Sequence, residues 1–240
     1  MKLQIIEEKK EKEGYPSWIY QNKIKFKPKV EEDFFIEGDS SNYDILWDCA
    51  KEIKGIDGLV LEIGVSLGMS SFVIMNSCIE NNDMDRRFFG IDCYGAWAPS
   101  FTNQMKIAAK RNLFQFCYDM NIDYTMIELE DTEFFKRYED GIPVYSRTVW
   151  DTKQYKPEDY EWKKICNEYA LVHLDGPHRL EDVELESDFF LPRIVAGGFI
   201  VYDDIDKPQK YDHDEFEPNI FKAGFELFKK EGTKAAYRKI

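Results

Sequence analysis

Apolar residues beyond position 58 fall into short continuous runs separated by segments in which they recur with a helical period. Short runs bounded by turn residues are typical of strands buried on both faces. The expected strands are Leu59–Ile63, Phe88–Ile91, Tyr124–Leu129, Ala170–Leu174, Phe199–Tyr202 and Ala235–Ile240. The expected helices are Met69–Ile79, Asn103–Met120, Leu180–Leu191 and Asn219–Lys230. Strands that alternate with helices indicate parallel pairing, so we expect a doubly wound, mostly parallel α/β sheet.

Two segments stand outside this pattern. Residues 1–57 are rich in charged and aromatic side chains and end in a short helix that Ser41 is expected to cap. We expect them to form an N-terminal arm and helix that pack on one domain, residues 58–240. Residues 134–168, with a helix expected over 158–167, are too long for a simple connection. They predict an insertion that serves as a lid or binding loop, or else a surface loop.

Composition narrows the class of protein. The 240 residues carry a formal charge of −14, which argues against nucleic acid as a partner because phosphate binding depends on Lys and Arg. No apolar run approaches the ~20 residues that span a bilayer, and the charged N-terminus does not resemble a signal peptide. Five scattered cysteines, none in a C-x-x-C pair, are expected to be free thiols. We therefore expect a cytoplasmic protein without membrane contact.

A glycine-rich turn follows the first strand, in the segment Glu62-Ile63-Gly64-Val65-Ser66-Leu67-Gly68. Gly64 and Gly68 would let the backbone approach a ligand, and the following helix offers its free N–H groups. Glu62 at the strand end could accept hydrogen bonds from that ligand. The candidate cofactor-binding residues of this segment are Glu62, Gly64, Ser66, Gly68, Ser70 and Ser71.

Three interpretations of this turn compete. A dinucleotide-binding fold lacks support because Ser66 stands where the second glycine of G-x-G-x-x-G belongs. A hydrolase with Ser66 as nucleophile matches G-x-S-x-G, but only one helix precedes the turn, where several strands are expected. The segment also resembles the E-x-G-x-x-x-G loop of class I methyltransferases, and this interpretation is favoured.

Acids at later strand ends extend the candidate site. Asp92 ends the second strand, the position that reaches ribose hydroxyls in nucleotide-binding α/β folds. Asp131 and Thr132 follow the third strand and are assigned to the adenine, on the basis of the same resemblance. The sequence thus indicates a cofactor that contains a ribose.

A second group of residues indicates the chemistry. Asp175 ends the fourth expected strand, and Asp203 with Asp204 ends the fifth, so these carboxylates should converge and bind a divalent cation. Mg²⁺ is preferred over Mn²⁺ or Ca²⁺. The cation would stabilise a hydroxyl acceptor as its alkoxide, and His178 would take the proton. The plainer alternative is that these acids only cap helices and turns.

The other two histidines have simpler interpretations. His173 lies inside an expected strand, which favours a core histidine with satisfied hydrogen bonds. His213, among acidic residues, is expected in a solvated loop.

Together these motifs resemble the metal-dependent O-methyltransferases of the class I S-adenosylmethionine family, nearest to the macrocin and mycinamicin type that methylate deoxysugars. The resemblance covers about residues 58–204. It implies a Rossmann-like sheet, metal ligands at Asp175, Asp203 and Asp204, and catalytic roles for Asp175 and the base His178. Whether the last hairpin of a seven-stranded sheet is present stays open, because the chain after Asp204 is short.

The leading hypothesis is therefore an S-adenosylmethionine-dependent O-methyltransferase that acts on a sugar or sugar-containing small molecule with the help of a metal. Trp18, Tyr145 and Trp150 are expected to shape the acceptor pocket. The alternatives are a metal-independent enzyme that methylates oxygen or nitrogen, and a non-catalytic interaction module. A homo-oligomer is compatible with each.

Overall fold

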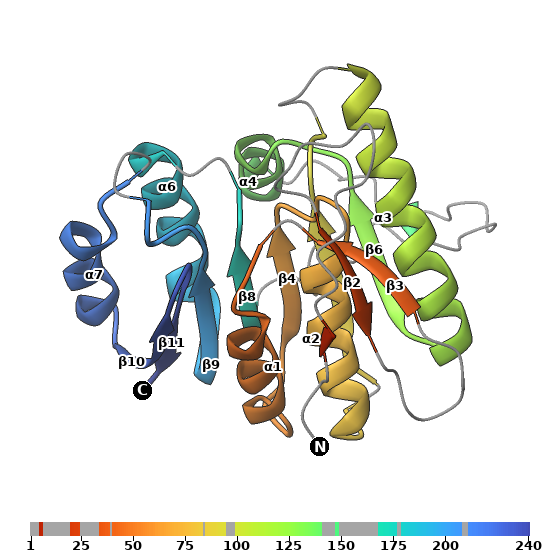
Figure 1. The fold of residues 1–240 in the computed structure, drawn as a ribbon. Coiled ribbons are helices and arrows are strands. Elements are labelled where there is room, and N and C mark those ends of the chain that lie inside the picture. Colours follow the sequence, from red (N-terminus) through yellow and green to blue (C-terminus); the bar gives the residue numbers. More distant parts are fainter. Residues whose placement is uncertain are drawn as a thin grey trace.

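The fold is centred on an eight-stranded sheet (Figure 1). The computed structural model describes residues 5–6, 20–24, 34–38, 40–83, 85–94, 99–140, 147–148, 168–176, 179–207 and 211–240. In spatial order the strands are β10 (Phe225–Glu231), β11 (Lys234–Lys239), β9 (Ile194–Tyr202), β8 (Tyr169–Leu174), β4 (Leu59–Ile63), β5 (Arg87–Ile91), β6 (Asp123–Ile127) and β7 (Arg147–Thr148). The five strands from β9 to β6 are parallel, whereas β11 and β7 run antiparallel to their neighbours. The expected doubly wound, mostly parallel sheet is confirmed.

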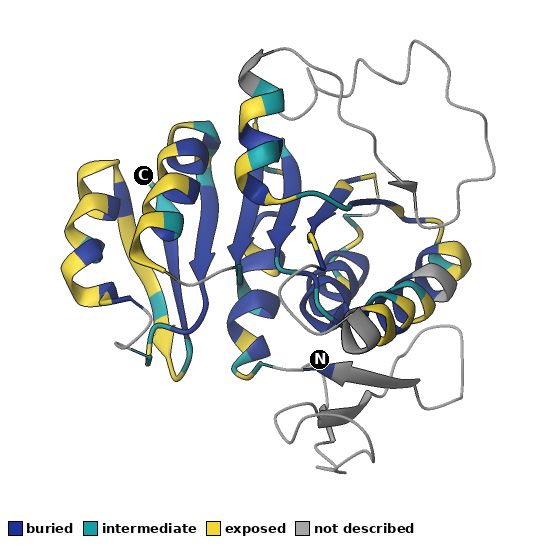
Figure 2. Cartoon of the chain, turned by 90° about the horizontal axis from the view of Figure 1, so that it is seen from above, coloured by how far each residue is buried: buried dark blue, intermediate teal, exposed yellow. Residues whose placement is uncertain are grey.

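Helices cover both faces of the sheet. The first group is α1 (Tyr43–Glu52), α2 (Met69–Glu80) and α3 (Pro99–Met120), and the second is α4 (Asp131–Asp140), α6 (Leu180–Phe190) and α7 (His213–Lys222). Successive residues of β4 divide between two cores: Val60 packs with the first group, and Leu61 with the second. Figure 2 shows the central strands buried on both sides, with exposed residues on the outer surfaces of the helices. This explains why these strands are continuous apolar runs.

Three short strands belong to the N-terminal region. β1 (Ile5–Ile6), β2 (Tyr20–Ile24) and β3 (Phe34–Gly38) form a separate antiparallel sheet, and β3 lies beside α2. The aromatic residues assigned to the acceptor pocket and the helix expected over 158–167 lie outside the described residues. Their roles stay predictions.

The C-terminal region corrects the sequence interpretation. The helix expected over Asn219–Lys230 is wrong, because α7 ends at Lys222 and β10 begins at Phe225. Gly224 lies between them with φ +87°, a left-handed conformation that ends a helix. The closing strand expected at Ala235–Ile240 is confirmed as β11, and it completes a hairpin with β10.

Three local expectations also change. Asn42, not Ser41, precedes α1, and no side chain caps that helix. His213 is buried at the start of α7, with Nε2 2.7 Å from the Tyr237 hydroxyl, so the solvated-loop prediction is wrong. Burial, then the positive charge of Lys230, lowers the pKa of His213 to about 4. The helix α4 was not expected, because most of its residues lie in the insertion predicted over 134–168.

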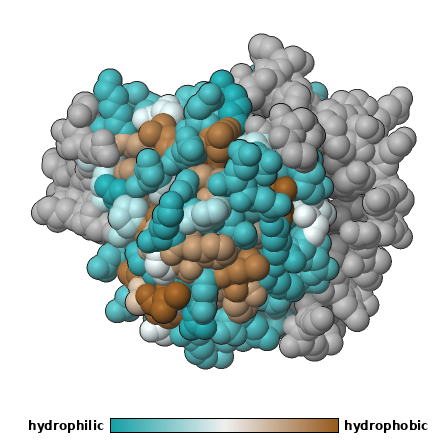
Figure 3. All heavy atoms as spheres, turned by 90° about the vertical axis from the view of Figure 1, so that its left-hand side faces the viewer, coloured by the Kyte–Doolittle hydropathy of each residue, from teal (hydrophilic) through white to brown (hydrophobic). Residues whose placement is uncertain are grey.

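The surface gives few further indications. None of the described helices is both long and apolar enough to cross a bilayer. Cys49, Cys78 and Cys117 are buried free thiols, and Cys93 is an exposed one. Figure 3 shows hydrophobic side chains among hydrophilic ones at the β10 end of the sheet. The exposed apolar residues of α7, β10 and the C-terminus are Phe221, Leu227, Phe228 and Ile240.

Candidate active site

The glycine turn after β4 lies directly against the end of β8. Gly64 has φ +86°, and a Cβ atom built on it would be 1.9 Å from the backbone oxygen of Asp175. The backbone N–H of Asp175 donates to the carbonyl of Ile63 at 2.9 Å. Gly64 is thus required for the close approach of two strand-end loops. The sequence alone predicts only that Gly64 lets the backbone approach a ligand.

Asp92 is held at the neighbouring strand end, β5. Its carboxylate accepts from the backbone N–H of Ser66 at 2.8 Å and from that of Tyr94 at 2.7 Å. Gly68 starts α2 with φ +90°, and a Cβ atom there would be 2.9 Å from the Leu113 side chain. These contacts fix the turn beside Asp92. The geometry is that expected of a loop and an acid that share one ligand.

Glu62, Ser70 and Ser71 are buried at the same place. The Ser71 hydroxyl donates to Oε2 of Glu62 and lies 3.0 Å from the hydroxyl of Tyr124. Oε1 of Glu62 lies 2.9 Å from Nδ1 of His173. Both carboxylate oxygens of Glu62 therefore have protein partners, so Glu62 links the start of α2 to β8.

Asp131 and Thr132 begin α4, where an adenine was expected. The Thr132 N–H donates to Oδ1 of Asp131 at 2.7 Å, and Oδ2 of Asp131 is buried with no hydrogen-bond partner among the described residues. Glu186 of α6 is also buried, and its Oε1 is 2.8 Å from where a Cβ atom of Gly176 would stand. Burial, then the neighbouring Asp131 carboxyl, raises the pKa of Glu186 well above its usual range. Glu186, which the sequence analysis did not identify, thus supports the turn after β8.

Replacing Glu186 with glutamine is expected to make stability less dependent on pH. Folding raises the pKa of Glu186 above its value of 4.5 in the unfolded chain. The protonated carboxyl therefore stabilises the folded state fully below pH 4.5, and this contribution is lost as the pH rises through the pKa of the folded state. In that window the unfolding free energy of the wild type should fall by up to ~1.4 kcal/mol per pH unit, and Glu186→Gln should not show this fall. Urea unfolding from about pH 4 to about pH 8 measures both slopes. Glu184→Gln, an exposed position on the same helix, is the control; equal slopes in both variants would contradict the assignment.

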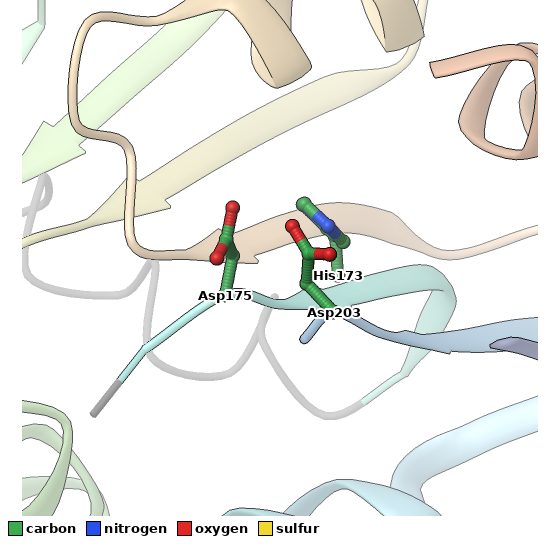
Figure 4. Close-up of side chains that lie close together, drawn as sticks. All are labelled: His173, Asp175 and Asp203. Atoms are coloured by element: carbon green, nitrogen blue, oxygen red, sulfur yellow. The ribbon is translucent and has the colours of Figure 1, made fainter. Parts of the chain in front are cut away.

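The acids at the ends of β8 and β9 converge only in part. His173, Asp175 and Asp203 offer ligand atoms that all lie within 4.8 Å of one another (Figure 4). Asp204 is not in this group; its carboxylate accepts from Lys207. The predicted base His178 lies outside the described residues. The structure therefore brings together two of the three predicted metal ligands and adds a histidine.

A buried lysine faces Asp203. Nζ of Lys234 is 2.5 Å from Oδ2 of Asp203, and the Ser40 hydroxyl donates to the same oxygen at 2.6 Å. Burial acts to raise the pKa of Asp203, but the positive charge of Lys234 outweighs it and holds the pKa below its usual range. Lys234 was not identified from the sequence. Only the register of β11 reveals it: Ala235 pairs with Tyr202, which sets Lys234 opposite Asp203.

A glycine turn at the carboxyl ends of parallel strands is typical of nucleotide-binding α/β proteins, and comparison with protein families is more specific. Residues 61–205 match a family described as a methyltransferase domain. Because the match covers more than half of the chain, the protein belongs to this methyltransferase family. The interpretation of Ser66 as a hydrolase nucleophile is thereby excluded. No curated protein sequence matches the chain.

Solved structures share the fold at low identity. Two structures of CalS11, a TDP-rhamnose 3'-O-methyltransferase of calicheamicin biosynthesis, are 14% and 13% identical, with TM-scores of 0.53 and 0.55. In both, the alignment covers 82% of this chain and 76% of the other. The O-methyltransferase NovP is 13% identical with a TM-score of 0.48, over 82% of this chain and 78% of its own. The likeness to CalS11 concerns the fold alone.

Proposed function

We propose that this methyltransferase transfers the methyl group of S-adenosylmethionine to a hydroxyl oxygen of a sugar or sugar-containing small molecule. The observation that carries the proposal is the contact between the glycine turn and the acidic cluster, since Gly64 touches the carbonyl of Asp175. A cofactor held by the turn would present its reactive end to the carboxylates of Asp175 and Asp203. Proximity of this kind supplies most of what methyl transfer to a prepared oxygen requires.

The residues around the turn would bind the cofactor. Asp92, oriented by two backbone N–H groups, is assigned to the ribose hydroxyls. Asp131, buried at the start of α4 after the third parallel strand β6, is assigned to the adenine amino group. S-adenosylmethionine, when bound, supplies a methyl group activated by a sulfonium.

The acidic cluster fits a divalent cation. Asp175 and Asp203 would hold it, and His173 adds a nitrogen at the same place. A bound divalent ion lowers the pKa of a coordinated hydroxyl and favours the alkoxide nucleophile. His178, the proposed base, follows Asp175 by three positions in the sequence. The alternative is a metal-independent methyltransferase, favoured by one observation: Lys234 already provides a positive charge to Asp203.

The acceptor is proposed on chemical grounds. A net charge of −14 disfavours a nucleic acid as the acceptor. A hydroxyl is the acceptor that a metal ion held by carboxylates would activate. CalS11, which shares the fold, is named for methylation of a nucleotide-linked deoxysugar. This supports a sugar as the first acceptor class to test.

Calorimetry with S-adenosylhomocysteine tests cofactor binding. We expect the wild type to bind, and Asp92→Asn to bind about tenfold to a hundredfold more weakly, because a charge-assisted hydrogen bond to the ribose is lost. Asp57→Asn, in the exposed turn before β4 at the opposite end of that strand, should bind like the wild type. Absence of binding at millimolar ligand would refute the cofactor assignment. Transfer of labelled methyl groups to a panel of sugar nucleotides and catechols, with and without EDTA, then tests acceptor class and metal dependence.

A further inference from the structure

His173 is a buried histidine with one unused nitrogen. It lies on β8, is 0% exposed, and its Nδ1 is 2.9 Å from Oε1 of Glu62. Its Nε2 has no hydrogen-bond partner among the described residues. The sequence predicted a core histidine with satisfied hydrogen bonds, and that prediction is wrong for Nε2. A buried polar atom without a partner is costly, so it indicates a ligand.

Glu62 fixes which nitrogen of His173 is available. A carboxylate can only accept, so Nδ1 of His173 donates to Glu62, and Nε2 is the nitrogen left for a ligand. Glu62 is itself held by the Ser71 hydroxyl. Histidines that bind metals generally donate their other N–H to a carboxylate in this way, which orients the ring.

Hydrogen bonds also hold the two aspartates of the cluster in place. Oδ2 of Asp203 accepts from Ser40 and Lys234, and its Oδ1 accepts from the N–H of Asp204 at 2.7 Å. The backbone of Asp175 is fixed by its bond to Ile63. Figure 4 shows the side chains of His173, Asp175 and Asp203 extending from β8 and the end of β9 to the same side of these strands.

Carboxylates predominate among the described charged groups beside His173. Glu62, Asp175 and Asp203 bring three carboxylates, and Lys234 brings one ammonium group. Glu62 and Asp203 are each 2% exposed and Lys234 is 0% exposed, so solvent compensates little. Asp175 is partly exposed, and a divalent ion beside it would place positive charge next to the buried carboxylate of Asp203.

We propose that His173, Asp175 and Asp203 bind a divalent transition-metal ion, with His173 coordinating through Nε2 in place of Asp204. This inference rests on the metal assistance in the proposed function and specifies its ligands. Carboxylates alone suit Mg²⁺ and Ca²⁺, whereas an imidazole nitrogen shifts preference toward transition metals. The site should therefore bind Mn²⁺ more tightly than Mg²⁺.

Electron paramagnetic resonance of Mn²⁺ added to the full chain, without S-adenosylmethionine, tests the proposal. We expect binding, and spin-echo modulation from a directly bonded ¹⁴N nucleus. His173→Gln should abolish the nitrogen modulation and weaken binding at least about tenfold, since second-shell changes alone cost tenfold to a hundredfold. Asp204→Asn should keep the modulation and bind within about threefold of the wild type. Excess Mg²⁺ should displace Mn²⁺ poorly.

Calorimetry with S-adenosylhomocysteine separates the outcomes. A His173→Gln protein that still binds S-adenosylhomocysteine is folded, so its loss of Mn²⁺ can be assigned to the ligand. Absence of Mn²⁺ binding, or binding without ¹⁴N modulation, overturns the inference. If the wild type binds S-adenosylhomocysteine but no Mn²⁺, the metal site fails and the methyltransferase assignment stands. If it binds Mn²⁺ with ¹⁴N modulation but no S-adenosylhomocysteine, the metal site stands and the proposed cofactor site fails.

Discussion

Replacing Lys234 with methionine is expected to lower the unfolding free energy by about 3–5 kcal/mol, the usual loss when one partner of a buried ion pair is removed. Nζ of Lys234 is 2.5 Å from Oδ2 of Asp203, and the two side chains are 0% and 2% exposed. Without the ammonium group, Asp203 keeps its bonds to the Ser40 hydroxyl and the Asp204 N–H but remains buried without an opposing charge. Urea unfolding near neutral pH, at an unchanged m-value, measures the loss.

Two controls identify the source of this loss. Lys229→Met removes an ammonium group that pairs with Asp48 at the surface, and we expect it to lower the unfolding free energy by less than about 1 kcal/mol. The double variant Asp203→Asn/Lys234→Met should be more stable than the sum of the single effects predicts, because neither charge is left alone. A Lys234→Met protein no less stable than Lys229→Met would contradict the assignment.

The same pair predicts a dependence on pH. Lys234 holds the pKa of Asp203 below the unfolded value of 3.8, against the opposing effect of burial. A carboxyl whose pKa is lowered by folding stabilises the folded state at pH values above its pKa in the unfolded chain. This contribution is lost as the pH falls through its pKa in the folded state. The stability difference between the wild type and Lys234→Met should therefore shrink below about pH 4. A difference that stays constant in acid would mean that packing of the lysine stem, not charge, is its cause.

The central strands could be predicted from the sequence because strands buried on both faces consist of nearly continuous apolar residues. β4 and β8 are covered on both faces, so nearly all of their positions are apolar, and their runs stand out. Gly64 and Asp92 were recognisable for a related reason: each follows such a run directly. The ends of parallel strands meet at one edge of the sheet, so these residues could be grouped without knowing any partner.

The C-terminal hairpin could not be predicted in the same way. β10 lies at the edge of the sheet, and most of its residues are exposed, so it lacks a continuous apolar run. Its residues include Phe225 and Phe228, three positions apart, which imitates a helical period. Only Gly224, with its positive φ, indicates that the helix has ended.

The failure to predict Lys234 and to distinguish Asp203 from Asp204 follows from that hairpin. Lys234 reaches Asp203 through the antiparallel register of β11 against β9, which no local pattern reveals. Without this partner, Asp203 and Asp204 looked equivalent in sequence. The structure separates them, since Asp203 faces Lys234 and His173 whereas Asp204 accepts from Lys207. His173 was misjudged because a strand histidine is ordinarily satisfied on both nitrogens.

Gly64→Ala is expected to destabilise the fold more than an alanine at the other glycine of this turn, Gly68. At Gly64 the Cβ atom would stand 1.9 Å from the oxygen and 2.5 Å from the carbon of the Asp175 carbonyl, and both are backbone atoms that no rotamer change can move. Forced overpacking costs about 1–3 kcal/mol, and a left-handed φ adds about 1–2 kcal/mol for a non-glycine residue. We expect thermal unfolding to show a loss of about 3 kcal/mol or more.

Gly55→Ala separates the two contributions. Gly55 has a similar φ of +77°, but a Cβ atom there meets nothing within 4 Å, so only the backbone term of about 1–2 kcal/mol should remain. Equal losses in the two variants would mean that the β4 and β8 loops separate freely. If they do not, relief of the clash must move Asp175 away from the turn. Gly64→Ala should then weaken binding of both S-adenosylhomocysteine and Mn²⁺, because one backbone contact holds the cofactor loop and the acidic cluster together.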